Sequence, residues 1–250
     1  MSKQQKKVSV FLQAKGGVGK SFLAFFKLLT GEPEKTAVIL LDSSQKANQN
    51  AGRHRKVVGE KNVKTWDIYN SAHEYKKSHF FDVFENCAAL EAQNIILDFG
   101  APESNVLREA LSSDEEVTGE NLRYVADELS LDISFNVVVS GADDNVNENI
   151  DYFKAINQAL NQYFPVQMLI NDYTFKADGD SELLKNALLE KGIASENQLS
   201  IVGKTGNRNN DNAYLIIASI ANGETTLEEG RKNMSARIRL RNLTEPLATL

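Results

Sequence analysis

The stretch Lys15-Gly16-Gly17-Val18-Gly19-Lys20-Ser21 lies between an apolar run, Val8–Leu12, and a largely apolar helical run, Phe22–Leu29. A strand, a glycine-rich turn and a helix N-terminus in this order are typical of a phosphate-binding loop. The glycines let backbone N–H groups curl around an anion, and the helix dipole adds positive potential. In such a loop, Lys20 contacts the β- and γ-phosphates of a nucleotide and the Ser21 hydroxyl binds Mg²⁺.

This loop departs from the general pattern G-x-x-x-x-G-K-[ST] at its start. The pattern is met from Gly19 onward, but Ala14 stands at the first-glycine position and Lys15 follows it. An ordinary loop of this kind requires no lysine at that place. Lys15 therefore distinguishes this loop from an ordinary phosphate-binding loop.

Length and composition are those of one α/β domain with a full core. The chain has 250 residues, of which 42% are hydrophobic and 25% charged, and a net charge of −6 that excludes a globally basic nucleic-acid binder. Its single cysteine, Cys87, excludes an internal disulfide and a cysteine-based metal cage. His54, His73 and His79 share no metal-ligand spacing. We expect a cytoplasmic protein with no integral membrane segment.

Apolar runs and helical patterns alternate along the chain. The predicted strands are Val8–Leu12, Ala37–Leu41, Asn94–Phe99, Ile133–Ser140, Val166–Ile170 and Gln198–Val202. The predicted helices are Ser21–Leu29, Phe80–Leu90, Val146–Gln162, Glu182–Glu190 and Asn212–Ala221. This alternation predicts an α/β fold, a mostly parallel sheet with helices on both faces, whose ligands bind at the carboxyl ends of the strands. We expect a single domain over residues 1–250, with a C-terminal basic helical segment from about 224 to 250. The acidic segment Ser112–Ser130 is interpreted as a solvated loop and helix, with a partner-binding role as the alternative.

A second nucleotide motif lies in the middle of the chain. Ile95-Ile96-Leu97-Asp98 is an apolar strand that ends in a carboxylate, as a Walker B motif does. Asp98 at the strand end can hold Mg²⁺ through a water. Gly100 follows it and can offer a backbone N–H to the γ-phosphate as a switch. The alternative is that Asp98 only caps the next helix.

A third segment, Val38–Asn48, completes the comparison with a known family. Together with Lys15 and Asp98, it makes the chain resemble the ParA/MinD group of deviant Walker A ATPases, and within that group the TraL/StbB-type proteins of conjugative plasmids. The resemblance covers nearly the whole chain, through Val8–Ser21, Val38–Asn48, Asn94–Ala110, Phe135–Asp144, Val166–Tyr173 and the basic tail Met234–Leu250.

The resemblance implies a P-loop ATPase that binds ATP and Mg²⁺ and forms an ATP-dependent homodimer. Lys15 matches the lysine that reaches across the dimer to the partner's nucleotide. Asn171 matches the asparagine that reads the adenine edge, for which an amide offers both a donor and an acceptor. The turn Gly203–Asn207 forms the other wall of the base pocket. Asn171 alternatively forms a turn ahead of Asp172. The implied nucleotide ligands are Gly16, Gly17, Val18, Gly19, Lys20, Ser21, Asn171 and Gly203, and the implied metal ligands are Ser21 and Asp98.

One position departs from the family pattern Asp-x-Asp-Pro-Gln-x-Asn at the end of the second strand. Asp42 matches the first aspartate, but Ser44 stands where the family has the aspartate that positions the attacking water. A serine is a much poorer proton acceptor, so the loss costs orders of magnitude in rate. The candidate catalytic residues are Lys15, Lys20, Asp42 and Ser44. We predict slow or partner-dependent ATP hydrolysis, unless a local shift in register lets Asp42 itself position the water.

Two basic clusters are candidates for partner surfaces. In the C-terminal cluster, a helix would stack Arg237 on Arg241 and turn Met234 and Ile238 inward. Its basic residues, candidates for nonspecific DNA binding as in ParA-like proteins, are Arg231, Lys232, Arg237, Arg239 and Arg241. A solvated charged face is the alternative. The second cluster, for which a plain surface is the simpler interpretation, is Arg53, Arg55, Lys56, Lys61 and Lys64. Pro246 is expected to interrupt any membrane-targeting amphipathic helix.

The sequence thus favours an ATP-dependent dimeric switch that acts in conjugative plasmid transfer or in plasmid stability and positioning. Its expected partners are a second copy of the chain, a plasmid transfer or partition protein, and nonspecific DNA. The alternatives are a non-hydrolysing ATP-binding scaffold or assembly protein, which Ser44 favours, and a chromosomal ParA/MinD-like positioning ATPase. A metabolic enzyme of the same superfamily ranks below these, because one cysteine cannot hold a bridging iron–sulfur cluster.

Overall fold

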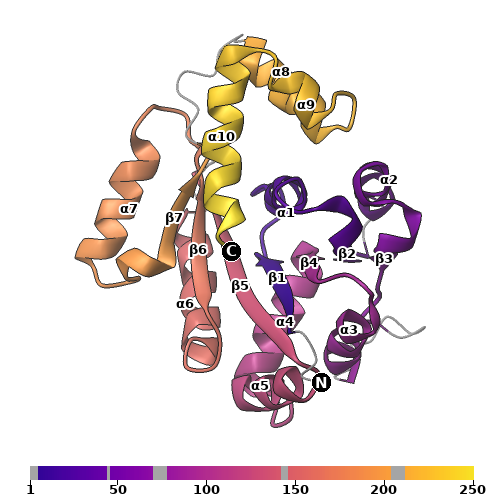
Figure 1. Ribbon diagram of the computed structural model, residues 1–250. Coiled ribbons are helices and arrows are strands. Elements are labelled where there is room, and N and C mark those ends of the chain that lie inside the picture. Colours follow the sequence, from indigo (N-terminus) through magenta and orange to yellow (C-terminus); the bar gives the residue numbers. More distant parts are fainter. Residues whose placement is uncertain (1–4, 44–45, 70–77, 142–145, 204–211) are drawn as a thin grey trace.

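The computed structural model describes residues 5–43, 46–69, 78–141, 146–203 and 212–250, and shows one parallel sheet between two layers of helices (Figure 1). Within the described residues the sheet has seven strands in the order β3-β2-β4-β1-β5-β6-β7, and every neighbouring pair is parallel. The strands are β1 (Lys6–Leu12), β2 (Thr36–Leu41), β3 (Val63–Thr65), β4 (Asn94–Phe99), β5 (Leu131–Ser140), β6 (Val166–Asn171) and β7 (Leu199–Val202).

The helices divide into two layers. One layer contains α1 (Lys20–Leu28), α2 (Lys46–Val58), α8 (Asn212–Ala221), α9 (Leu227–Gly230) and α10 (Met234–Ala248). The other contains α3 (Ser78–Ala89), α4 (Ala101–Ser113), α5 (Gly119–Glu128), α6 (Val146–Leu160) and α7 (Asp180–Glu190). Short 3₁₀ turns occupy Pro33–Lys35, Glu60–Asn62, Asp172–Thr174 and Glu196–Gln198.

Alternating side chains of the buried strands serve the two layers. In β2, Ala37, Ile39 and Leu41 pack into the core under α3–α6, whereas Val38 and Leu40 pack under α1 and α2. Successive side chains of a strand point to opposite faces, so a strand covered on both sides must be apolar throughout. This explains why β2 is a continuous apolar run.

The predicted fold class is confirmed, and each of the predicted strands and helices is found within a few residues of its expected bounds. The helices α2 and α4 and the edge strand β3 were not predicted. The acidic segment 112–130 does contain a helix, α5, but this helix is only partly solvated. Its Leu122 and Ala126 are buried in the core against the sheet, along with Val117 just before it.

The orientation of α10 differs from the prediction. Met234 and Ile238 point outward, with 67% and 51% of their surface exposed, and do not face the core. The buried stripe is instead Ala236, Leu240, Leu243 and Leu247. Both stripes have helical spacing, and the larger set of apolar residues takes the core.

Pro246 does not interrupt this helix, contrary to the prediction. It lies inside α10, close to the carboxyl end, and Leu247 beyond it is still buried. A proline removes one backbone donor and one intrahelical hydrogen bond. Burial of the leucine stripe on both sides of the proline offsets that loss. Among the described residues, no helix is both long enough and apolar enough to cross a membrane.

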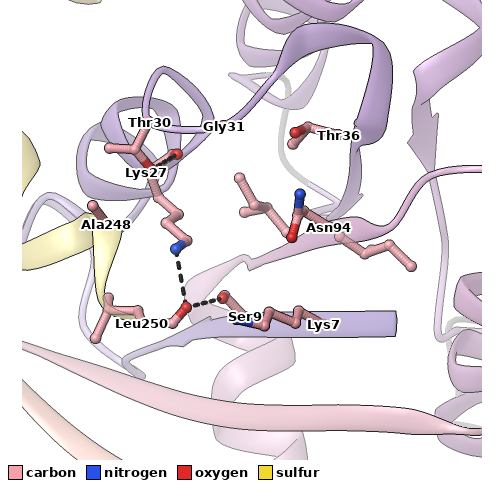
Figure 2. A pocket seen from close by; sticks show the side chains of 11 residues that line it. Lys7, Ser9, Lys27, Thr30, Gly31, Thr36, Asn94, Ala248 and Leu250 are labelled. Atoms are coloured by element: carbon pink, nitrogen blue, oxygen red, sulfur yellow. Dashed lines mark hydrogen bonds between the residues drawn. The ribbon is translucent and has the colours of Figure 1, made fainter. Parts of the chain in front are cut away.

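The end of α10 reaches the amino edge of the sheet beside α1 (Figure 2). Lys27, in the last turn of α1, donates hydrogen bonds to the main-chain oxygens of Leu247 and Leu250, at 2.9 and 3.0 Å. The cavity here has a volume of about 140 Å³, and Lys7 and Ser9 of β1 also line it. Burial, reinforced by the positive charge of Lys7, lowers the pKa of Lys27 from 10.5 to about 8.

Candidate functional site

The predicted site residues on β1, β2, β4, β6 and β7 follow the carboxyl ends of those strands, as expected for a parallel sheet. The central strand β1 lies between β4 and β5, so the loop after β1 adjoins the ends of both. Residues 44–45 and 204–211 lie outside the described residues. The predicted residue Ser44 and the predicted turn beyond Gly203 therefore lie outside the part of the chain that the structure describes.

The loop between β1 and α1 needs glycine at two positions. Gly17 and Gly19 have φ angles of +80° and +95°, which side chains of L-amino acids rarely adopt. A methyl group on Gly19 would also lie 2.2 Å from Asn171 Nδ2. Gly19 accepts the backbone N–H of Leu23 at 2.9 Å, which starts α1. The loop thus ends at a helix N-terminus, as phosphate binding requires.

Lys20 is the first residue of α1 and is buried. Its Nζ donates to the backbone oxygen of Lys15 at 3.2 Å, so it lies across the mouth of its own loop. Burial lowers the pKa of Lys20, and the nearby carboxylates of Asp98, Asp42 and Glu103 act in the opposite direction. A buried ammonium beside three carboxylates is suited to bind a phosphate once a cation also enters.

Ser21 and Asp98 form the predicted metal-side pair. The Ser21 hydroxyl and the Asp98 carboxylate are hydrogen-bonded to each other, and Asp98 is buried at the end of β4. Burial raises the pKa of Asp98 to about 6, against the opposing influence of Ser21, Lys20 and Arg53. Asp98 Oδ1 has no hydrogen-bond partner among the described residues. A hydroxyl next to a carboxylate with one oxygen to spare fits Mg²⁺, which binds such oxygens and keeps several waters.

Arg53 was predicted to lie on a basic surface, but it points into the molecule. Its guanidinium donates to the main-chain oxygens of Ser21 at 2.7 Å and of Ala221 at 3.0 Å, and it lies over the Phe25 ring. Its positive charge also favours the ionised form of Asp98 and so acts against the rise that burial causes in the pKa of that carboxyl. Arg53 therefore joins α2 to the start of α1 and to α8. Only the fold brings these three helices together, so no local pattern predicts this role.

Glu103 is a functional candidate that sequence reasoning missed. It lies in the first turn of α4, which begins after Gly100, and only 1% of its surface is exposed. Its Oε1 accepts the backbone N–H of Ser43 at 3.0 Å, and its Oε2 has no hydrogen-bond partner among the described residues. An acidic residue three positions after the switch-like Gly100 was the available signal.

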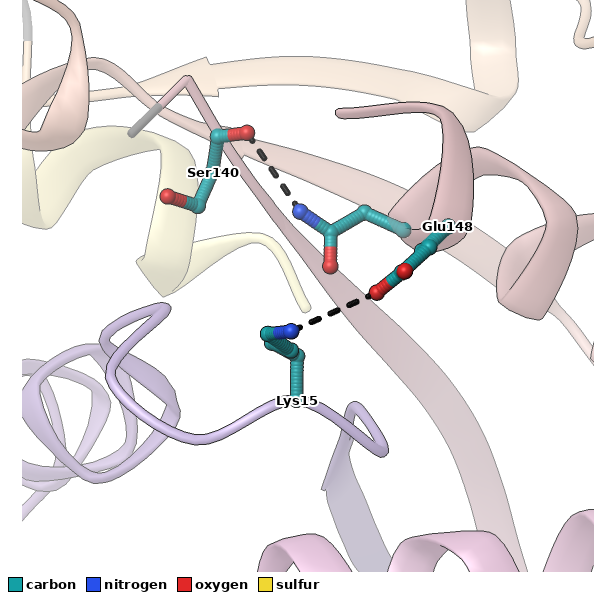
Figure 3. A network of polar contacts seen from close by, with 4 residues as sticks. Lys15, Ser140 and Glu148 are labelled. Atoms are coloured by element: carbon teal, nitrogen blue, oxygen red, sulfur yellow. Dashed lines mark hydrogen bonds and ion pairs between the residues drawn. The ribbon is translucent and has the colours of Figure 1, made fainter. Parts of the chain in front are cut away.

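Lys15 points away from its own loop and toward α6 (Figure 3). Its Nζ lies 3.4 Å from Glu148 Oε2, and 45% and 68% of the two side chains are exposed. An exposed pair of this kind contributes little to stability. Next to Glu148, the buried Asn149 donates to the Ser140 oxygen at the end of β5. Lys15 is therefore held loosely at a surface.

Asn171 lies directly under the loop. Its Nδ2 donates to the Val18 oxygen at 2.9 Å, while its Oδ1 has no partner among the described residues. Beside it, Phe22 packs against Tyr173, and a methyl group on Gly203 would meet the Tyr173 ring at 2.5 Å. The predicted base-pocket residues Asn171 and Gly203 thus lie at the ends of the neighbouring strands β6 and β7, and the Tyr173 ring contacts both Gly203 and Phe22 of α1.

The C-terminal basic residues separate into different faces of α10 and the turn before it. Arg231, Arg237 and Arg241 line a groove of about 550 Å³ together with the exposed Met234 and Ile238. Lys232 is exposed but does not line this groove, and Arg239 is only partly exposed. The five predicted residues therefore do not form one continuous stripe.

The comparisons with known proteins agree with this architecture. No family model matches the chain, and no curated protein sequence matches it. A plasmid partition protein from Borrelia burgdorferi has a similar structure, with 15% identity, a TM-score of 0.50, and coverage of 87% of this chain and 96% of its own. A candidate plasmid partition protein from the same bacterium, bound to AMPPNP, has 14% identity, a TM-score of 0.54, and coverage of 96% and 97%. At such identities the similarity shows a shared fold.

Proposed function

We propose that this chain is an ATP-binding switch protein that dimerises with ATP and Mg²⁺, hydrolyses ATP slowly or only with a partner, and serves plasmid partition or conjugative plasmid transfer in the cytoplasm. One observation carries the proposal. The loop after β1 places the buried Lys20 and the Ser21–Asp98 pair together at a helix N-terminus. The AMPPNP bound to a protein of the same fold supports ATP as the nucleotide.

Dimerisation rests on Lys15. Its side chain is about half exposed and forms an ion pair with the exposed Glu148, so the ammonium can be redirected at small cost toward the nucleotide of a second copy. In the ParA/MinD group, which the loop resembles, the matching lysine has this role. The experiment is sedimentation velocity of the purified chain with and without ATP and Mg²⁺. We expect a monomer without nucleotide and a dimer with it.

A matched pair of variants tests the lysine. Lys15→Ala should still bind a fluorescent ATP analogue but remain monomeric. Lys154→Ala is the control, because Lys154 is a similarly exposed lysine paired with Asp151 on α6. It should dimerise like the unmodified chain. A monomer at saturating ATP in the unmodified chain, or a dimer formed equally well by Lys15→Ala, would contradict the proposal.

The slow or conditional hydrolysis follows from Ser44. ATP binding requires only the loop and the metal-side pair, whereas fast hydrolysis requires a group that orients water. We expect single-turnover hydrolysis well below ordinary ATPase rates, unless a partner is added. A chain that turns over rapidly, and in which Ser44→Ala has no effect, would contradict this part of the proposal.

A non-hydrolysing scaffold is the second candidate, and Ser44 is the observation that favours it. The two candidates differ in what releases the dimer. In the scaffold, dimers formed with ATP persist until the nucleotide is exchanged. In the switch, they dissociate as inorganic phosphate appears. Following phosphate release and sedimentation in the same sample separates the two.

The biological role is tested with the plasmid that carries the gene. Lys20→Met should abolish the role while leaving the chain folded. Loss of plasmid retention over generations indicates partition, and loss of mating frequency with normal retention indicates transfer. The fold shared with plasmid partition proteins supports the first, and the resemblance to TraL/StbB-type proteins supports the second.

Nonspecific DNA binding is the remaining part of the proposal. Arg231, Arg237 and Arg241 share one groove and could neutralise phosphates together. Arg237→Gln with Arg241→Gln should weaken binding to duplex DNA of any sequence and reduce its salt dependence. Arg123→Gln, on the distant helix α5, is the control. Unchanged affinity in the double variant would contradict DNA binding through this groove.

A further inference from the structure

Two acidic side chains meet at the backbone of Gly100. A methyl group built there would lie 2.1 Å from Glu103 Oε2 and 3.1 Å from Asp42 Oδ1. Asp42 follows β2 and Glu103 belongs to α4. The fold therefore brings together carboxylates that lie 61 residues apart in the sequence. The negative charges of both carboxylates act to raise the pKa of Lys20, against the lowering that burial causes. The two carboxylates therefore lie beside the candidate phosphate-binding lysine.

Glu103 combines burial with an oxygen that has no partner among the residues the structure describes. It is almost completely shielded from solvent, and only its Oε1 is engaged, by the N–H of Ser43. Its Oε2 is buried with no hydrogen-bond partner among the described residues. A buried carboxylate oxygen without a partner is costly to the fold, and such groups concentrate at functional sites.

We propose that Glu103 supplies the carboxylate that orients and deprotonates the attacking water, the task that Ser44 is poorly suited to perform. The inference rests on the proposed function, because it requires bound ATP. The water oxygen bonds to the γ-phosphorus, and the bond from that phosphorus to the β–γ bridging oxygen breaks. The water proton passes to Glu103 and then to solvent. ATP and water become ADP, inorganic phosphate and a proton.

The contact with Ser43 explains why hydrolysis by this group would be conditional. Ser43 lies immediately after Asp42 at the end of β2 and directly before Ser44, the position that departs from the family pattern. Because Oε1 accepts the Ser43 N–H, the position of the Glu103 carboxylate is coupled to that of the Ser43 backbone. A nucleotide or partner that shifts the Ser43 backbone would also shift the carboxylate.

A purely structural role for Glu103 makes a different prediction. A carboxylate in the first turn of a helix is stabilised by the helix dipole, and an acceptor for the Ser43 N–H holds the segment after β2. Glutamine preserves the acceptor oxygen and nearly the same volume, but it cannot take a proton. Alanine removes both. The two substitutions therefore separate proton transfer from support.

The experiment measures ATP binding and single-turnover hydrolysis in the full chain. Glu103→Gln should bind a fluorescent ATP analogue within about threefold of the unmodified chain, yet hydrolyse ATP at least about 100-fold more slowly. Glu103→Ala should lose as much rate. Glu103→Asp, which keeps a carboxylate, should retain more activity than Glu103→Gln. The exposed Glu109→Gln on the same helix should change neither quantity.

The outcomes that overturn the inference are distinct from those that overturn the proposed function. Unmodified chain that does not bind ATP overturns both. Chain that binds ATP and dimerises but never hydrolyses it overturns the inference, and it leaves the non-hydrolysing scaffold as the function. Hydrolysis by Glu103→Gln at the unmodified rate, with Glu103→Ala impaired, assigns Glu103 a supporting role. Hydrolysis lost in Asp42→Asn but retained in Glu103→Gln assigns the water to Asp42. If Glu103→Gln fails to fold, equal rates for Glu103→Asp and Glu103→Ala overturn the inference.

Discussion

Two lysines at opposite ends of α1 are placed in contrasting surroundings. Lys20 at the carboxyl edge of the sheet donates to one main-chain oxygen and lies among three carboxylates. Lys27 at the amino edge donates to the main-chain oxygens of Leu247 and Leu250, and besides burial the charge of Lys7 lowers its pKa. Burial lowers the pKa of both lysines.

The difference separates a binding site from a structural contact. At Lys27, main-chain oxygens of Leu247 and Leu250 accept hydrogen bonds from the ammonium and tie the end of α10 to α1. At Lys20, the local charge is unbalanced toward the negative, and the buried oxygens Asp98 Oδ1 and Glu103 Oε2 lack partners among the described residues. Binding of Mg²⁺ and a phosphate would stabilise this arrangement, because the two groups bring positive charge and ligands to these buried oxygens and to Lys20.

The largest expected effect comes from removing Lys20, and removing Lys27 should have almost none. Lys20→Met should weaken ATP binding about 100-fold, or about 2.7 kcal/mol, because a charge-assisted hydrogen bond to phosphate is lost. Lys27→Met is the matched control on the same helix and should bind ATP within about twofold of the unmodified chain. Titration with a fluorescent ATP analogue measures both. Equal losses would show that the two ends of α1 do not differ in the way proposed.

A smaller effect is expected from the glycine that allows the loop to close over Asn171. Gly19→Ala should lower the free energy of unfolding by about 2 kcal/mol, because φ is +95° and the new methyl group lies against Asn171 Nδ2. Gly16→Ala is the control, since its methyl group would meet nothing within 4 Å. Urea denaturation of the nucleotide-free chain measures both. Equal stability of the two variants would show that an alanine at position 19 causes no backbone strain and no clash with Asn171.

The residues around Lys20 differ in how far the sequence predicts them. The loop, Lys20, Ser21 and the strand ending at Asp98 are local patterns, so they were predictable from spacing alone. Arg53 and Glu103 depend on contacts between α2, α4 and the strand ends, which only the parallel sheet order brings together.

The same limit applies to α10. Met234 and Ile238 have helical spacing, as do the leucines from 240 onward, and the sequence does not say which stripe finds a partner. Packing against α1 and β7 decides this, and it buries Leu240, Leu243 and Leu247. Helix periodicity therefore predicts a helix here, while tertiary contacts choose its buried face.

The structural character of Lys27 gives a pH-dependent prediction. The pKa of Lys27 is about 8 in the folded chain against 10.5 ordinarily, because burial disfavours its charge. Below pH 8 both folded and unfolded chains carry the proton. Between pH 8 and 10.5 only the unfolded chain holds it, so raising the pH favours the folded chain. Relative to Lys27→Met, the unmodified chain should gain about 1 kcal/mol across this window, a value discounted for the partial exposure of Lys27.

Urea denaturation at several pH values measures this gain, with Lys35→Met as the control. Lys35 is an exposed lysine paired with Glu32, and its pKa is raised by that hydrogen bond rather than lowered. Its removal should leave the gain at alkaline pH in place. A difference between the unmodified chain and Lys27→Met that stays constant from pH 7 to 10.5 would contradict a buried, weakly basic Lys27.

The smallest expected effect concerns Lys15, the lysine outside the buried pair. Glu148→Gln removes its exposed ionic partner and should change the free energy of unfolding by less than about 0.5 kcal/mol. The same change frees Lys15 for a second copy of the chain, so the ATP-dependent dimer should tighten by about twofold. Asp151→Asn, which breaks the similar Lys154 pair on α6, should alter neither quantity. A dimer weakened by Glu148→Gln would mean that Glu148 contributes to the interface and does not compete for Lys15.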